Sequence, residues 1–379
     1  MLFRSRKSPL LPGAEALFDQ LADAVYLIDP DTSNIVWGNR KNYVGGEVVE
    51  QFENAISKFL GSPYCVAVNS CTDALVLGLA ALGVRRGDEV ITPPNSFIAS
   101  TAAIVHLGAT PVFVDVLPNQ SINPNLVEKA ITKKTKAIMP VHLGGRMVDM
   151  DQISRIAASY SVAVIEDAAQ SIGSTFNGKL SGTFGDVGCF SAHPLKNLNA
   201  LGDGGFVCFK SQEMAEEVKK LRSHGLIDRN TVDTFGYVSR LDAIQAAVLT
   251  FRLTRLAATI KSRRTNADLY RSQLNPDYIF VPDDDPREQN SYHTFVVQVD
   301  RRDELIAHLL SCGIGTAIHY PIPIHLQPAA KSLGFSEGSF PVTEKQAKRI
   351  LTLPINQNLS GSEIAQVSSA VNNFYCGKR

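Results

Sequence analysis

From about residue 46 onward, short apolar runs alternate with longer stretches in which apolar residues recur at helical spacing. The longer stretches occupy residues 47–61, 72–83, 96–108, 123–131 and 149–160, and we expect each to form a helix. The short runs, each an expected strand, are YCVAV, EVITP, TPVFVDV, AIMPV, VAVIED, VGCFSA and GGFVCF. Strands joined by helices are typical of βαβ units. The pattern therefore predicts an α/β fold with a seven-stranded, mainly parallel sheet sandwiched by helices.

The pattern changes in the last third of the chain. Residues 241–272 form a long helical stretch, and a loop rich in proline and aspartate follows it at 275–290, which is typical of a domain boundary. The remainder alternates short strands and helices. We therefore predict an N-terminal arm over residues 1–45, a large domain over 46–255 and a smaller C-terminal α+β domain over 256–379.

Composition indicates an ordinary globular protein, with 379 residues of which 44% are hydrophobic and 20% charged. Basic and acidic residues balance at 37 each, so no global field would attract nucleic acid or a membrane surface. Six cysteines lie far apart without a CxxC pair, which favours free thiols in a reducing cytosol over disulfides or a zinc site. No apolar stretch is typical of a signal peptide or approaches the ~20 residues of a membrane span. We expect a cytoplasmic enzyme without a metal.

Ligands of α/β sheets gather at the carboxyl ends of the strands, where this sequence places an aspartate and a lysine. Asp167 ends the run VAVIED, and a buried carboxylate is costly unless it meets a cation, such as the protonated nitrogen of a pyridine ring. It could equally cap a helix. Lys196 follows VGCFSA and precedes the turn GDGG, which should place it in the mouth of the sheet. A partly desolvated lysine has the lowered pKa that imine chemistry requires.

Two neighbouring features each allow two interpretations. Residues 69–73 open a helix, and exposed amides at a helix N-terminus suit a phosphate group, although a simple Ser/Thr cap explains the same residues. His193 lies three residues before Lys196 and is either a polar group of the site or a structural hydrogen-bonding residue.

Several motifs together carry a resemblance to a known family. Asp167 and Gln170 lie in IEDAAQSIGS, and Lys196, in FSAHPLKNLNALGDGG, comes 29 residues after Asp167 (196 − 167). With SCTDAL, GDEVITPPNSFIAS, SRLDAIQAAVL and HYPIPIHLQ, these motifs resemble the DegT/DnrJ/EryC1/StrS family of sugar aminotransferases, which depend on pyridoxal 5'-phosphate (PLP). The similarity covers roughly residues 45–375 and implies the fold-type I architecture of PLP transferases.

The resemblance implies a role for each matching residue at the cofactor ring. Lys196 would form the Schiff base with PLP and move the proton between cofactor and substrate carbons. Asp167 would pair with the pyridinium nitrogen, and Gln170 would lie near the 3-oxygen of the ring. Phe97 would stack on the ring face, as aromatic side chains do with flat cofactors.

The resemblance also implies contacts with the phosphate and the sugar. Cys71, Thr72 and Ser191 would hold the phosphate, and His325 and Tyr320 would line the sugar side.

A segment farther along the chain could reach the diphosphate of the substrate. Arg222, with His224 and Arg229 nearby, has the charge for this contact, although a solvated loop explains these residues nearly as well.

Two positions depart from the family. Glycine is usual at the position of Cys71, so the close approach of a phosphate that glycine permits is in doubt. Asparagine is usual at Val238, where it reaches across a dimer interface to the partner's cofactor phosphate. Valine cannot donate that bond, so either Ser239, Tyr237 or a nearby arginine replaces it, or PLP binds less tightly. A homodimer with the active site at the subunit interface is still expected.

The resemblance predicts a transaminase that moves an amino group, as in relatives from L-glutamate, to a nucleotide-linked 3- or 4-keto-6-deoxysugar by a ping-pong mechanism. Pyridoxamine 5'-phosphate (PMP) would form during turnover. A PMP-dependent sugar dehydratase is disfavoured because such relatives replace the lysine with histidine. A non-catalytic regulatory relative is disfavoured because Asp167 and Lys196 are both present. The absence of GxGxxG after the first strand disfavours a dinucleotide-dependent dehydrogenase.

Overall fold

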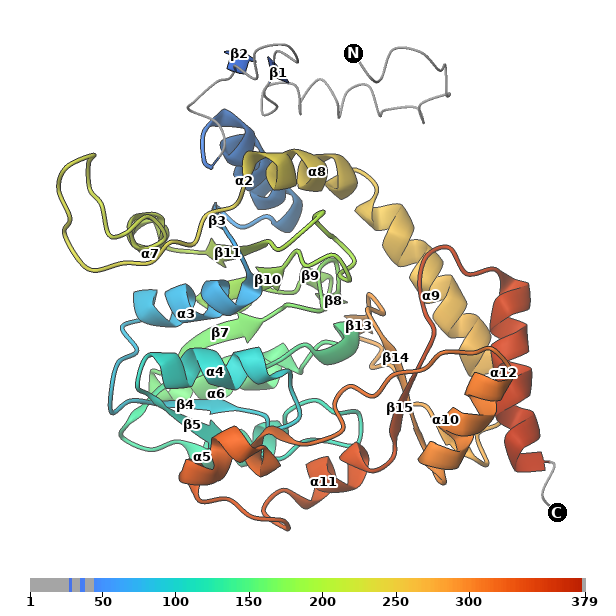
Figure 1. Ribbon diagram of the computed structural model, residues 1–379. Helices are drawn as coiled ribbons and strands as arrows, with labels where there is room; N and C mark the ends of the chain where they lie inside the picture. The colour runs from blue at the N-terminus through green and yellow to red at the C-terminus, as the bar shows by residue number, and fades with distance from the viewer. Residues whose placement is uncertain (1–26, 29–34, 38–43, 377–379) are drawn as a thin grey trace.

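A seven-stranded sheet lies at the centre of the computed structural model, which describes residues 27–28, 35–37 and 44–376 (Figure 1). The strand order across the sheet is β3, β11, β10, β7, β6, β4 and β5. Strand β11 runs antiparallel to both neighbours, and every other neighbouring pair is parallel. The predicted seven-stranded, mainly parallel sheet is therefore confirmed. The strands are β3 (Tyr64–Val68), β4 (Glu89–Thr92), β5 (Thr110–Phe113), β6 (Thr135–Ile138), β7 (Ala163–Asp167), β10 (Val187–Ser191) and β11 (Gly205–Phe209).

Helices cover both faces of this sheet because successive side chains of each strand point to opposite faces. In β3, Val66 and Val68 pack on one face in a cluster with α3, α4 and α7, whereas Cys65 and Ala67 pack on the other in a cluster with α2 and α8. Helix α6 packs on the sheet in a third hydrophobic cluster, which includes Ile91 of β4. The helices are α2 (Glu47–Leu60), α3 (Cys71–Ala81), α4 (Ile98–His106), α5 (Pro124–Ala130), α6 (Met150–Tyr160), α7 (Gln212–Leu221) and α8 (Ala243–Leu253).

The C-terminal third of the chain builds a second, smaller sheet with its own hydrophobic core. Strands β12 (Ile279–Phe280), β14 (Phe295–Val299) and β15 (Ile350–Leu353) pair antiparallel. The helices packed on them are α9 (Leu256–Gln273), α10 (Arg302–Ser311) and α12 (Gly361–Cys376). Figure 1 shows α9, α10 and α12 together at one side of the large sheet.

One C-terminal segment returns to the large sheet. Helix α11 (Pro341–Ala347) begins where Asp115, just beyond β5, accepts hydrogen bonds from the amides of Val342 and Thr343. Phe340 packs on Phe113 of β5 with the short 3-10 helix η2 (Ile324–Leu326). The other 3-10 helices are η1 (Leu143–Gly145) and η3 (Pro328–Leu333), and the remaining short strands are β1 (Leu27–Ile28), β2 (Ile35–Trp37), β8 (Thr175–Phe176), β9 (Lys179–Leu180) and β13 (Glu288–Gln289).

The long helical stretch expected over residues 241–272 is two helices. Helices α8 and α9 meet at Thr254 and Arg255 with a bend of 61°. No single helix among the described residues is long and apolar enough to cross a membrane, and only this bent pair, taken together, meets that test of length and composition. The division at 255/256 stays a prediction, and most of the predicted arm over residues 1–45 lies outside the described residues.

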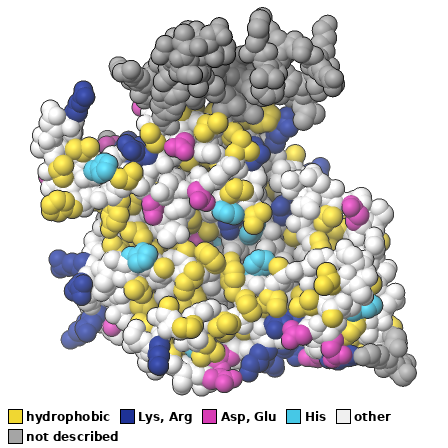
Figure 2. All heavy atoms as spheres, viewed as in Figure 1, with side chains coloured by type: hydrophobic (Ala, Val, Ile, Leu, Met, Phe, Trp, Pro, Cys, Tyr) yellow, Lys and Arg dark blue, Asp and Glu magenta, His cyan; other side chains and the backbone are white. Residues whose placement is uncertain are grey.

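The face of the molecule seen in Figure 2 carries no continuous patch of one charge. Acidic and basic side chains are both scattered over it, and hydrophobic side chains spread across its middle with histidines among them.

Candidate active site

The loops that follow β3, β7 and β10 open into one cavity of about 510 Å³ at the carboxyl ends of these strands. The N-terminal residues of α3 and α4 line it, as do two short segments of the C-terminal part, at residues 293–294 and 319–320. The structure thereby brings together most of the predicted site residues. They are Lys196, Asp167, Gln170, Phe97, Cys71, Thr72, Ser191 and Tyr320.

Asp167 is the last residue of β7 and is only 4% exposed. Its Oδ2 accepts a hydrogen bond of 2.6 Å from the hydroxyl of Ser100, and its Oδ1 accepts one of 3.1 Å from the amide of Ala169. Burial raises the pKa of Asp167, and these two hydrogen bonds act in the opposite direction. Because a buried carboxylate is stabilised by a cation, this side chain is suited to face a protonated ring nitrogen.

Lys196 lies in the turn after β10, where its amide donates to the carbonyl of His193 over 2.8 Å. Its Nζ lies 3.4 Å from Nε2 of His293. Burial lowers the pKa of Lys196, so the uncharged amine is reached at a lower pH than in an exposed lysine. His193 also lines the cavity, but its Nδ1 accepts from the amide of Leu195 over 3.2 Å, which gives it a structural role in the turn.

His293 was missed by the sequence analysis. It directly precedes Thr294 and strand β14, and its contact with Lys196 joins residues 97 positions apart. The imidazole is buried, and burial together with the charge of Lys196 lowers the pKa of His293 well below its ordinary value. The sequence does place a histidine just before the apolar run FVVQV, which could have marked it as a candidate. A single sequence, however, does not show that this histidine lies beside Lys196.

The N-terminus of α3 has the Ser cap of one interpretation that the sequence left open, and the binding of a phosphate there stays a prediction. Ser70 is the cap, and its hydroxyl accepts from the amide of Asp73 over 3.2 Å. The first amides of a helix have no partner inside it, so those of Cys71 and Thr72 remain for a ligand. The thiol of Cys71 is buried, and burial raises its pKa well above the ordinary value. It therefore packs as a small uncharged group.

A glycine explains how this helix end comes so close to the sheet. A Cβ added to Gly205, in the turn GDGG, would lie 2.5 Å from the carbonyl carbon of Ser70 and 2.7 Å from the nitrogen of Cys71. Only glycine leaves room for this approach of β11 to α3. The turn GDGG, which follows Lys196, therefore also shapes the N-terminal end of α3.

Phe97, Gln170 and Tyr320 line another part of the same cavity. The rings of Phe97 and Tyr320 lie 5.5 Å apart at 44°, and Phe97 is 52% exposed, which leaves a ring face for a ligand. Gln170 accepts from the amide of Gly144 over 2.7 Å and donates to the hydroxyl of Tyr320 over 3.2 Å. Its contact with a cofactor ring stays a prediction, as does the contact of Ser191 with a phosphate.

Two predicted substrate contacts lie elsewhere. His325 is buried in η2, its Nε2 is 3.0 Å from Oε1 of Glu344, and it does not line the cavity. Arg222 is also absent from the cavity lining, and it donates from Nη1 to Glu53 and to the carbonyl of Ala67, over 2.6 and 2.5 Å. The Nδ1 of His325 has no hydrogen-bond partner among the described residues. Neither residue lines the cavity, and the contact of each with the substrate stays a prediction.

Ser239 and Tyr237 are the residues that could donate to a phosphate in place of the asparagine usual at Val238, and the structure shows which of them already has a partner. Val238 is 53% exposed and pairs with Ser223 in an isolated bridge. The hydroxyl of Ser239 is buried, accepts from the amide of Asn69 over 3.3 Å and donates to its Oδ1 over 3.2 Å. Tyr237 is 42% exposed and stays available.

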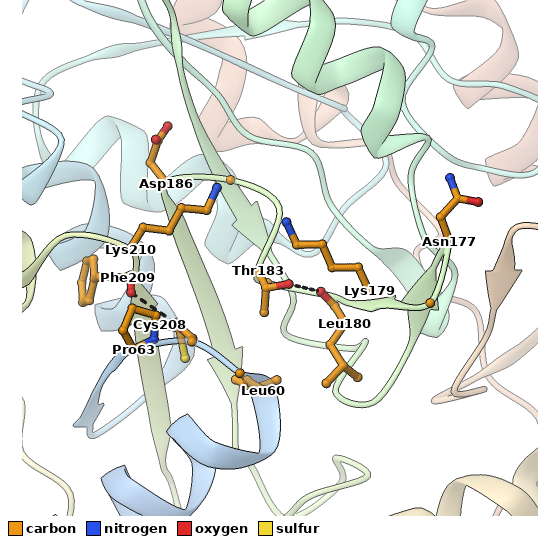
Figure 3. A pocket seen from close by; sticks show the side chains of 15 residues that line it. Leu60, Pro63, Asn177, Lys179, Leu180, Thr183, Asp186, Cys208, Phe209 and Lys210 are labelled. Atoms are coloured by element: carbon orange, nitrogen blue, oxygen red, sulfur yellow. Dashed lines mark hydrogen bonds between the residues drawn. The ribbon is translucent and has the colours of Figure 1, made fainter.

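A second cavity, of about 560 Å³, lies between the end of α2, the loop around β9 and the end of β11. Lys179 and Lys210 extend toward it from two different segments (Figure 3). Lys210 donates to the carbonyl of Phe184 over 2.6 Å, and the Nζ of Lys179 lies 4.7 Å from the centre of the Phe184 ring. None of the predicted site residues lines this cavity. The cavity around Lys196 is therefore the candidate active site.

Comparison with known proteins shows the family of the chain. Residues 34–372 match the model of the DegT/DnrJ/EryC1/StrS aminotransferase family. The chain is 41% identical, over 87% of each chain, to dTDP-3-amino-3,4,6-trideoxy-alpha-D-glucose transaminase of Streptomyces venezuelae. It is 39% identical to the pleiotropic regulatory protein of Geobacillus stearothermophilus, over 88% of this chain and 91% of that protein.

The same similarity holds in three dimensions. The crystal structure of S. venezuelae DesV in complex with a ketimine intermediate superimposes with a TM-score of 0.89 at 37% identity. The match covers 97% of this chain and 96% of DesV.

Proposed function

Because this chain belongs to the DegT/DnrJ/EryC1/StrS aminotransferase family, we propose that it transfers an amino group to the keto group of a nucleotide-linked sugar, with PLP as its cofactor. One observation carries the proposal. The amine of Lys196 and the buried carboxylate of Asp167 line the same cavity, at the ends of the adjacent strands β10 and β7. Relatives named as transaminases of dTDP- and UDP-linked sugars support the substrate class.

The residues around the cavity fit PLP. Asp167 offers a carboxylate to the ring nitrogen, Phe97 offers a ring face, and the first amides of α3 offer donors to the phosphate. The bound cofactor would supply an electron sink that stabilises negative charge on the substrate carbon. Lys196 would bind the cofactor through Nζ and, as the uncharged amine, accept and return the proton of that carbon. The walls formed by Phe97 and Tyr320 would restrict water at this amine.

The amino donor, the assembly and the location are further parts of the proposal. The donor is L-glutamate, and donor and sugar react in turn by a ping-pong mechanism. The chain forms a homodimer with the active site at the subunit interface, and works in the cytoplasm. The dimer is supported by apolar side chains exposed on one segment, where Phe235 is 98% and Ile227 61% exposed.

A regulatory function is the second candidate, since two relatives are named as a pleiotropic regulatory protein and as a sensory transduction protein of erythromycin biosynthesis. A protein that only binds ligands has no need for a lysine of lowered pKa beside a buried carboxylate. The presence of Lys196 also disfavours a PMP-dependent dehydratase. We therefore favour catalysis.

The proposal is tested with purified protein, PLP and glutamate against a panel of nucleotide-linked 4-keto- and 3-keto-6-deoxyhexoses. Amination of at least one sugar, with formation of 2-oxoglutarate, is the expected result. Lys196→Ala should abolish both half-reactions, and Lys179→Ala, which alters a lysine of the other cavity, should leave them unchanged. If glutamate converts the bound PLP but no sugar is aminated, the sugar assignment fails while the transaminase assignment survives.

A further inference from the structure

His293 carries an unexplained buried nitrogen beside Lys196. Its Nε2 lies 3.4 Å from Nζ of Lys196, within the range of a weak hydrogen bond. Its Nδ1 is buried and has no hydrogen-bond partner among the described residues. The backbone of this residue is held in place, because Arg263 donates from Nη1 to the carbonyls of Tyr292 and His293 over 2.9 and 3.3 Å. These bonds hold the main chain from which the imidazole extends to Lys196.

The surroundings keep this imidazole uncharged. Burial is the largest cause of the lowered pKa of His293, and positive charge on Lys196, Arg263, His319 or His193 lowers it further. His319 is itself held by a hydrogen bond of 2.9 Å between its Nδ1 and the hydroxyl of Thr352. A neutral imidazole carries one proton, on either Nδ1 or Nε2.

The unpaired Nδ1 decides between these two forms. With the proton on Nδ1, a buried N–H would lack an acceptor, which is rare in folded proteins. With the proton on Nε2, Nδ1 presents only a lone pair, and Nε2–H points at Nζ. A lysine that receives this hydrogen bond must offer a lone pair, and only the uncharged amine has one.

We propose that His293 is a positioning residue that holds the amine of Lys196 uncharged whenever it is not bonded to the cofactor, by donating Nε2–H to the lone pair of Nζ. This hydrogen bond acts together with burial, which lowers the pKa of Lys196, and against the charges of Cys71 and Asp167, which raise it. This inference rests on the proposed role of Lys196 as the lysine that bonds PLP.

The test measures Lys196 directly, apart from turnover. Cofactor-free protein is mixed with PLP, and the rate at which the visible absorbance of lysine-bound PLP appears is followed against pH. The rate requires the uncharged amine, so its decline on the acid side reports the pKa of Lys196. In His293→Leu the donor is lost, and we expect this decline to move upward by about one pH unit, a tenfold change in the uncharged fraction at a given pH.

Conservative variants separate the hydrogen bond from packing. The amide nitrogen of Gln in His293→Gln can take the place of Nε2 and should restore most of the wild-type profile. The shorter His293→Asn cannot reach Nζ and should behave as His293→Leu, which keeps the test decisive if the leucine variant does not fold. His106→Phe alters a histidine at the exposed end of α4, outside the cavity lining, and should leave the profile in place.

Three outcomes would contradict the roles proposed for His293 and Lys196. An unmoved profile in His293→Leu or His293→Asn assigns His293 to packing alone. A downward shift means that Nε2 accepts from a protonated lysine, the opposite of the proposal. If Lys196→Ala still develops the absorbance of lysine-bound PLP, the proposed role of Lys196 fails, whatever the His293 variants show.

Discussion

Ser100 donates its hydroxyl proton to Oδ2 of Asp167 over 2.6 Å, and both side chains are buried. The two residues come from different layers, since Ser100 belongs to helix α4 and Asp167 ends strand β7. Burial raises the pKa of this carboxylate, and the hydrogen bond opposes that rise. The hydroxyl therefore helps to keep Asp167 ionised at the place where we propose that it faces the cofactor nitrogen.

Replacement of Ser100 by alanine should weaken cofactor binding. Without this bond more of Asp167 is protonated in the cofactor-free protein, and a loss of about 1.4 kcal/mol in its pairing with PLP would make PLP dissociate about tenfold more readily. Because loss of the bond raises the pKa of Asp167 further, PLP retention should begin to fail at a higher pH as the solution is acidified. Absorbance of protein-bound PLP during dialysis, across a pH series, measures both effects.

The neighbouring Thr101 provides the control. Its hydroxyl is buried in the same helix but has no partner among the described residues, so Thr101→Val removes no hydrogen bond. Equal losses of PLP in the two variants would show that packing of α4, and not the bond to Asp167, controls the affinity.

Gly205→Ala should disturb the phosphate end of the site. The new Cβ would lie 2.5 Å from the carbonyl carbon of Ser70, so β11 or the first turn of α3 must move. We expect weaker PLP binding and a loss of unfolding free energy of about 1–3 kcal/mol, as for other overpacked sites. Calorimetry and PLP titration measure the two quantities. At Gly315, where an added Cβ meets nothing within 4 Å, the same substitution should change neither.

The strands and the two central residues could be predicted from sequence because their signals are local. Each strand is a short apolar run, and Asp167 and Lys196 follow runs that proved to be neighbours, with Cys189 paired to Asp167 across β10 and β7. Loops after adjacent parallel strands open on the same edge of a sheet. Their meeting in one cavity therefore follows from topology.

The contacts of Ser100 and His293 could not be predicted, because they join parts of the chain without a shared local pattern. Ser100 lies 67 positions from Asp167, and His293 lies 97 from Lys196, across the junction with the C-terminal part. The position of His325 outside the cavity could not be predicted for a similar reason. It is five residues from Tyr320, yet η2 turns it toward Glu344 and away from the cavity.

His325→Leu therefore tests a structural role. Loss of the 3.0 Å bond leaves Glu344 without its imidazole partner in a buried position, and the unfolding free energy should fall by about 1–3 kcal/mol. The KM for the sugar should change less than about twofold, since less than 0.5 kcal/mol of substrate binding would be lost. Denaturant unfolding and steady-state kinetics measure these values. His106→Leu, at the exposed end of α4, is the control for stability. A raised KM for the sugar with an unchanged unfolding free energy would show that His325 contacts the substrate.

Val238→Asn should strengthen PLP binding if the subunits assemble as proposed. Val238 is 53% exposed, so an asparagine there can extend from the surface without disturbing a core, and its amide can donate to a phosphate of the partner subunit. One added hydrogen bond to a charged group should slow PLP loss by about tenfold. The gain should vanish when the protein is diluted to monomers, because the donor then has no partner subunit to reach.

A second valine of the same segment is a matched control for this gain. Val232 is 51% exposed and also lies in an isolated bridge, with Leu226, so Val232→Asn makes the same chemical change at a similar site. PLP release followed by absorbance at several protein concentrations compares the two variants. If both slow release equally, or if the effect of Val238→Asn persists in the monomer, residue 238 does not act across a subunit interface.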